Sequence, residues 1–95
     1  MVVGVLRLEL HLYSPGSLKE KRGIVRSLLG RCRANFPVSC AETGLYDLWQ
    51  RAELGFAVVE RDVPTIQALF ERIEEEIARS GFAEAGERFT EFLHY

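Results

Sequence analysis

The chain has 95 residues, of which 47% are hydrophobic and 27% are charged, a composition typical of a soluble globular protein. This length suffices for one domain, residues 1–95, whose core needs no metal or disulfide to hold it together. No apolar run reaches the ~18 residues that cross a bilayer, and residues 1–12 lack the features of a signal peptide. We therefore expect a cytoplasmic protein with no membrane partner.

The charge is distributed unevenly although the net charge is only −2. Residues 1–36 carry seven basic and two acidic side chains, a balance of +5. Residues 37–95 carry five basic and twelve acidic side chains, a balance of −7. Such asymmetry indicates either a face for a polyanion or two halves of the chain that balance each other.

Residues 2–13 alternate between apolar and polar side chains, which predicts a long strand with one buried face. Ser14-Pro15-Gly16 ends this strand, because proline and glycine favour turns. Ser17 and Glu20 then have the spacing of a capping box, which predicts a helix that runs to about Ala34. Its apolar positions recur at intervals of three, four and seven, so we expect its basic side chains to face solvent.

The remaining elements follow in the order strand, strand, helix, strand. Residues 36–43 alternate again, and the loop 44–50 leads into a third strand over residues 51–59. Asp62 and Pro64 mark the start of a second helix, which ends at Ser80-Gly81. After a short irregular segment, residues 87–95 predict the last strand.

This β-α-β-β-α-β order predicts a ferredoxin-like α+β sandwich. Two interleaved right-handed crossovers give a four-stranded antiparallel sheet in the order 4-1-3-2, with both helices on one face. Many unrelated functions occur on this fold, so the fold alone implies none of them.

Three segments of the sequence match a known pattern: Ser17-Leu18-Lys19-Glu20-Lys21-Arg22, Val38-Ser39-x-Ala41-Glu42, and residues 47–55. They resemble the YlxP-like family of small bacterial proteins, a family of unknown function. The resemblance implies a ferredoxin-like fold, in agreement with the order of elements. It also implies ribosomal RNA or a ribosome-associated protein as a partner, because members are often encoded beside translation and ribosome-maturation factors. It implies no catalytic residues.

Basic side chains on the first predicted helix form the first candidate site. On an exposed helix they would neutralise RNA phosphates and release counterions. The alternative is a solvated face, or one that balances the glutamates of the second helix. The candidate residues for binding RNA or a partner are Lys19, Lys21, Arg22, Arg26 and Arg33, together with Trp49 and Arg51.

Trp49 and Arg51 belong to residue types that are enriched at binding hot spots, and this pair has the chemistry to sandwich a base. The alternative is an aromatic lid over the end of the sheet, with Arg51 paired to Glu53 or Glu42. We leave both interpretations open at this point.

The sheet face without helices is a further candidate. In its two central strands only His11 and Tyr13 offer rings that can stack, both at one end, so we do not expect bases to stack there as in RNA-recognition motifs. Small apolar residues on this face instead predict a homodimer. The expected interface consists of Val3, Val5, Gly55, Ala57 and Val59.

The cysteines and histidines give no sign of a metal or catalytic site. Cys32 and Cys40 form no Cys-x-x-Cys pair, so we predict buried reduced thiols, no metal and no cofactor. His11 and His94 lie late in strands that run antiparallel, which places them at opposite ends of the sheet. Only an active site shared between two subunits would use them, and no catalytic triad is recognisable.

The sequence therefore favours a non-enzymatic accessory protein that contacts ribosomal RNA or the small ribosomal subunit through a basic helix. The alternative is a homo-oligomeric structural or ligand-sensing module with no nucleic-acid role.

Overall fold

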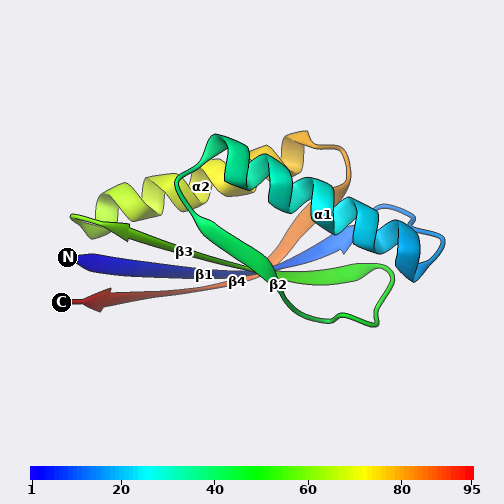
Figure 1. Ribbon diagram of the computed structural model, residues 1–95, viewed down its shortest axis with the longest axis horizontal. Helices are drawn as coiled ribbons and strands as arrows, with labels where there is room; N and C mark the ends of the chain where they lie inside the picture. The colour runs from blue at the N-terminus through cyan, green and yellow to red at the C-terminus, as the bar shows by residue number, and fades with distance from the viewer.

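A computed structural model describes all residues from Met1 to Tyr95. The strands are β1 (Val2–Leu12), β2 (Ser39–Gly44), β3 (Arg51–Glu60) and β4 (Ala83–His94), and the helices are α1 (Leu18–Asn35) and α2 (Val63–Arg79). The strands form one antiparallel sheet in the order β2-β3-β1-β4, and both helices cover the same face (Figure 1). The predicted ferredoxin-like sandwich is confirmed. Neither helix combines the length and apolar character that a membrane crossing requires.

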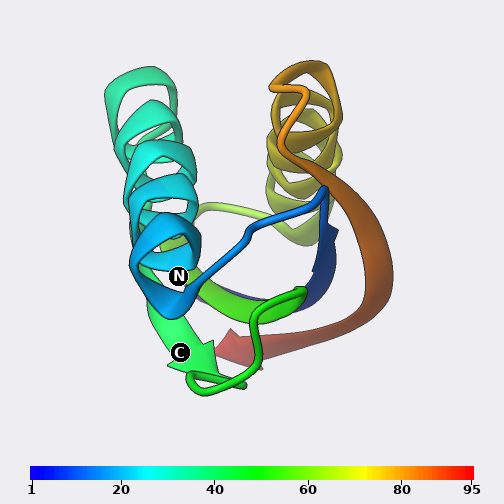
Figure 2. The ribbon, with the colours of Figure 1, turned by 90° about the vertical axis from the view of Figure 1, so that its right-hand side faces the viewer.

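The end-on view in Figure 2 shows both helices on one side of the sheet, and the core lies between these two layers. Twenty buried apolar side chains form one cluster, in which Leu6, Leu8 and Leu10 of β1 are fully buried. Each large apolar side chain contributes about 1.5–3 kcal/mol on burial, so this cluster dominates the stability of the fold. A side chain at Gly4 would collide with Ile66 of α2, which explains the glycine in the middle of a strand.

Both helices begin where their capping residues predict. The Ser17 hydroxyl accepts the amide of Glu20 at 3.1 Å, and the Glu20 carboxylate accepts the amide of Gly16. In α2, the Asp62 carboxylate accepts the amide of Thr65 at 2.9 Å and its hydroxyl at 2.7 Å. These two bonds, the amide bond first, lower the pKa of Asp62, because they stabilise its charged form.

The second strand begins later than its alternation predicts. α1 runs to Asn35, and Phe36 caps the helix by donating its amide to the carbonyl of Cys32 at 2.9 Å. Phe36 and Val38 pack against the core from this connection and not from a strand. Their alternation with polar neighbours therefore gives a strand-like pattern in the sequence, although these residues lie outside β2.

The last strand begins at Ala83 and not at residue 87, so the predicted irregular segment is wrong. A β-bulge makes the first part of this strand hard to recognise from the sequence. At the bulge, Gly86 and Glu87 both lie opposite Glu9 of β1. The extra residue reverses the alternation of inward and outward side chains. No single period-two pattern therefore covers the whole strand.

The thiols of Cys32 and Cys40 are buried in the core, as predicted. Burial raises the pKa of Cys32 to about 11 and also raises the pKa of Cys40. The reactive thiolate form is therefore scarce at neutral pH, which fits a structural role for both side chains.

Candidate functional site

Four basic side chains of α1 face solvent along one stripe of the helix, at intervals of three, four and seven residues. We call this stripe the basic ridge; it consists of Lys19, Arg22, Arg26 and Arg33. None of the four forms an ion pair with an acidic side chain. Their predicted exposure is correct, and their positive charge is available to a ligand.

Three arginines of the basic ridge line one groove between α1 and the edge strand β2. The groove has a volume of about 230 Å³ and is lined by Arg22, Arg26 and Arg33, with Val25, Leu29 and Glu42. Arg33 reaches across it and donates to the carbonyl of Cys40 in β2 at 2.7 Å. This bond orients the Arg33 guanidinium without neutralising its charge.

Lys21 does not belong to the basic ridge, and its prediction as an exposed binding residue is wrong. It is only 1% exposed. Its ammonium donates to the carbonyls of Leu45 and Tyr46, the latter at 3.2 Å, and lies 3.3 Å from the carboxylate of Glu42. Two residues after Lys19, the helix has turned by more than half a revolution, so Lys21 points toward the sheet instead of toward solvent. Sequence reasoning missed it because lysines are rarely fully buried.

Lys21 anchors the loop 45–50 through two backbone carbonyls. The loop also carries large side chains that are exposed to solvent. Leu45 adopts a left-handed conformation with φ of 57°, which turns the chain so that two consecutive carbonyls face the ammonium. Tyr46, Leu48 and Trp49 remain 58%, 41% and 50% exposed. Trp49 is therefore not the closed lid of the alternative interpretation. Lys21 of α1 holds the loop near the start of that helix through the carbonyls of Leu45 and Tyr46. Figures 1 and 2 show the loop at the end of the sheet where α1 begins.

Arg51 lies on the open sheet face, opposite the face covered by α1 and its basic ridge. Its Nε donates to Glu9 of β1 at 2.7 Å, and its Nη2 contacts the same oxygen. The alternative that paired Arg51 with Glu53 or Glu42 does not hold, since Arg51 pairs with Glu9 and Glu53 accepts the Thr43 hydroxyl at 2.8 Å. The structure thus does not bring Arg51 into the basic ridge.

One arginine of α1 does balance the acidic helix α2. Arg31 lies 3.2 Å from Glu76, which also binds Arg79 at 2.7 Å. The bond from Arg79, followed by those from Arg31, lowers the pKa of Glu76. Charge balance between the helices therefore accounts for Arg31, but it does not account for the basic ridge, which has no acidic partner on α2.

The open sheet face has an apolar half at the end where β1 begins. Val3 pairs with Val59 and Leu93, and Val5 pairs with Ala57 and with the exposed Glu91 of β4, so these side chains form two adjacent rows, the second of which ends in a carboxylate. Sequence reasoning missed Leu93, because the bulge hides which residues of β4 share this face. We call this surface the apolar half; it consists of Val3, Val5, Ala57, Val59 and Leu93.

Gly55 contributes little to the apolar half, in contrast to its predicted place in an interface. The Thr43 side chain of β2 leans over it, so that a Cβ at Gly55 would lie 2.7 Å from the Thr43 methyl group. The glycine therefore makes room for Thr43 within the sheet.

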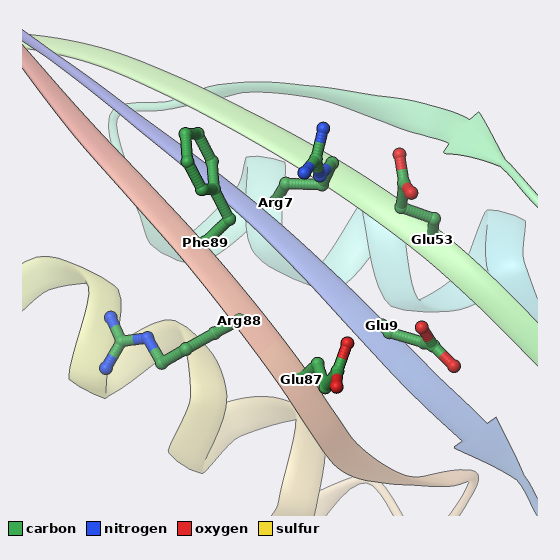
Figure 3. Close-up of a pocket in the computed structure, with 6 residues that line it drawn as sticks. All are labelled: Arg7, Glu9, Glu53, Glu87, Arg88 and Phe89. Carbon is green, nitrogen blue, oxygen red and sulfur yellow. The ribbon is translucent and has the colours of Figure 1, made fainter.

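The other half of the open face is charged and holds a shallow pocket of about 190 Å³. Figure 3 shows Arg7 and Phe89 projecting together from neighbouring strands, with the guanidinium 4.9 Å from the ring centroid. Arg88 projects toward α2, where it lies 3.0 Å from Glu74. The remaining lining residues are Glu9, Glu53 and Glu87.

The two histidines lie at opposite ends of the sheet, as predicted. Val2 at the start of β1 pairs with His94, whereas His11 at the end of β1 pairs with Glu84. One subunit therefore cannot combine their imidazoles in a single site.

Two of the three sequence segments that suggested a family meet at the buried ammonium, directly before the third segment begins. Lys21 comes from the first segment, Glu42 from the second, and the loop 45–50 leads into the third. Residues 3–87 match the model of a protein family of unknown function, DUF503. The chain belongs to the DUF503 family. The uncharacterized protein YlxP of Bacillus subtilis (strain 168) is 35% identical to it over 89 residues, which cover 83% of this chain and 97% of that protein.

Two solved structures are similar to this DUF503 chain in fold. A putative chlorite dismutase, TA0507, matches with a TM-score of 0.57 and 13% identity over 97% of this chain. A REP-associated tyrosine transposase bound to a REP hairpin matches with a TM-score of 0.52 and 10% identity, also over 97% of this chain. The chain spans only 44% and 57% of these two proteins. At such identities the likeness shows the fold alone.

Proposed function

We propose that this DUF503 protein is an accessory factor that binds ribosomal RNA through the basic ridge and the loop 45–50. The observation that carries the proposal is the groove between α1 and β2, in which Arg22, Arg26 and Arg33 converge without an acidic partner. Guanidinium groups match the geometry of phosphate oxygens and form paired hydrogen bonds with them.

The charge of the groove remains positive despite the presence of Glu42. The Glu42 carboxylate lies 3.3 Å from the Lys21 ammonium, so these two charges compensate each other beneath the surface. The three guanidinium groups that line the groove therefore keep their positive charge uncompensated. The ridge from Lys19 to Arg33 is ~21 Å long at the helical rise per residue. It is therefore long enough to follow several phosphates of an RNA strand.

The loop 45–50 gives this surface a second kind of contact. Trp49 is half exposed in the loop that Lys21 ties to the first turn of α1. Aromatic side chains in such positions stack on unpaired bases, largely without regard to sequence. Because Lys21 already holds the loop in place, the loop loses little further conformational freedom when RNA binds. The genes that accompany the YlxP-like family favour ribosomal RNA as the target.

The proposal is tested by sedimenting the protein with bacterial small ribosomal subunits and with naked ribosomal RNA over a range of salt concentrations. Three or four phosphate contacts predict that log K falls with log salt at a slope of about −2 to −4 on naked RNA. Retention on the subunit at moderate salt, above that on naked RNA, would support a ribosomal factor. Absence of binding to both at low salt would refute the proposal.

A further inference from the structure

We infer that the groove between α1 and β2 takes an unpaired strand of RNA, and that Tyr46 at one end of this groove stacks on a base of that strand. The inference rests on the proposed function and names the form of RNA that this surface recognises. It adds Tyr46, which is 58% exposed in the loop 45–50, to the residues that contact the RNA.

Hydrogen bonds and one ion pair fix the place of Tyr46 relative to the groove. At one end of the groove, Arg33 donates to the carbonyl of Cys40 at 2.7 Å. At the other end, the Lys21 ammonium lies 3.3 Å from the Glu42 carboxylate and donates to the Tyr46 carbonyl at 3.2 Å. The Tyr46 hydroxyl donates to the Glu42 carbonyl at 3.4 Å. Because Glu42 lines the groove, these contacts place Tyr46 at the end of the groove that lies near the first turns of α1.

The Tyr46 side chain is oriented before any ligand binds. Its backbone is held by Lys21 and its hydroxyl by the Glu42 carbonyl, yet more than half of the residue stays exposed. A ring that is already oriented loses little side-chain entropy when it makes a new contact. Exposed aromatic rings beside a basic groove are the platforms on which single-stranded nucleic acids stack their bases.

The lining of the groove favours an unpaired strand over a duplex. It combines the apolar side chains of Val25 and Leu29, which are 4% and 8% exposed, with three arginines. A single strand has phosphates for the arginines and a ribose or base for the apolar side chains. A duplex keeps the faces of its bases stacked inside the helix, so it offers none to the Tyr46 ring. A duplex would therefore contact the arginines alone.

Fluorescence anisotropy of labelled RNA, titrated with the full chain, tests this inference. The probes are an unstructured RNA strand of about twelve nucleotides and the same strand annealed to its complement. At moderate salt the single strand should bind at least about tenfold more tightly than the duplex. Tyr46→Ala should weaken binding of the single strand by about 5- to 100-fold, the effect of losing one stacked base, and leave binding of the duplex unchanged.

Two further tyrosine variants serve as controls. Tyr46→Phe keeps the ring and should retain most of the affinity for the single strand. Tyr95→Ala removes a 74% exposed tyrosine whose backbone pairs with Met1 at the opposite end of the sheet, and it should leave binding of both probes unchanged. Thermal unfolding checks that each variant is folded.

Three results would overturn the inference. They are equal affinity for the single strand and the duplex, full affinity of Tyr46→Ala for the single strand, and absence of binding to both probes. The proposed function is decided separately, by retention on the ribosomal subunit, so the inference can fail while the proposed function stands.

Discussion

Lys21→Met is expected to lower the free energy of unfolding by about 2–4 kcal/mol. Methionine fills a similar volume but leaves the Glu42 carboxylate without its cation and the carbonyls of Leu45 and Tyr46 without their donor. The Glu42 side chain keeps 21% of its surface exposed, so water relieves part of this loss. Urea denaturation at neutral pH measures the difference.

Two further variants isolate the cause of this effect. Lys19→Met removes the same charge from the exposed side of the helix and should change stability by no more than about 0.5 kcal/mol. Adding Glu42→Gln to Lys21→Met should restore part of the stability, since it removes the uncompensated carboxylate. Hydrogen exchange in residues 45–50 should quicken in Lys21→Met. Equal stability of the Lys19 and Lys21 variants would contradict the anchoring role of Lys21.

Charge reversal at Arg22 and Arg26 is expected to produce the largest effect on RNA binding. The double variant Arg22→Glu with Arg26→Glu should weaken binding to ribosomal RNA at low salt by about 100-fold or more. Two cations that face phosphates become two repelling anions. The log–log salt slope of whatever binding remains should become shallower by about 2. Neither side chain makes an internal hydrogen bond or ion pair, so the fold should be unaffected.

Arg61→Glu with Arg72→Glu is the matched control for this variant. It changes the net charge by the same amount, and both arginines are exposed and free of ion pairs. We expect this control to weaken RNA binding only slightly. An equal loss in both double variants would show that total charge governs binding and that the basic ridge has no special role.

Local patterns in the sequence predict most of the fold. The alternation of residues 2–13 gives β1, because a sheet with one covered face requires apolar side chains at every second position. Ser17 and Asp62 mark the helix starts, because their side chains bind amides that the helix leaves free. These signals depend only on neighbouring residues, so they can be read without the tertiary structure.

Features that depend on distant parts of the chain could not be predicted in this way. The partners of Lys21 are backbone carbonyls in a loop more than twenty residues away, and carbonyls leave no trace in the sequence. The bulge opposite Glu9 shifts β4 by one residue, which moves Leu93 and Phe89 onto the open face. The sequence thus predicted the exposed basic residues and Trp49 of the loop, but not the anchoring of the loop by the buried Lys21, and it predicted the apolar half without β4.

Fluorescence of Trp49 gives the most direct test of RNA binding by the ridge and loop. Trp49 is the only tryptophan of the chain, so the signal reports on the loop 45–50 alone. Titration with small-subunit ribosomal RNA should change the emission in a saturable manner as bases stack on the indole. The change should vanish in Arg22→Glu with Arg26→Glu and persist in Arg61→Glu with Arg72→Glu. RNA that leaves the emission unchanged, under conditions where the protein is folded, would contradict an RNA site at this surface.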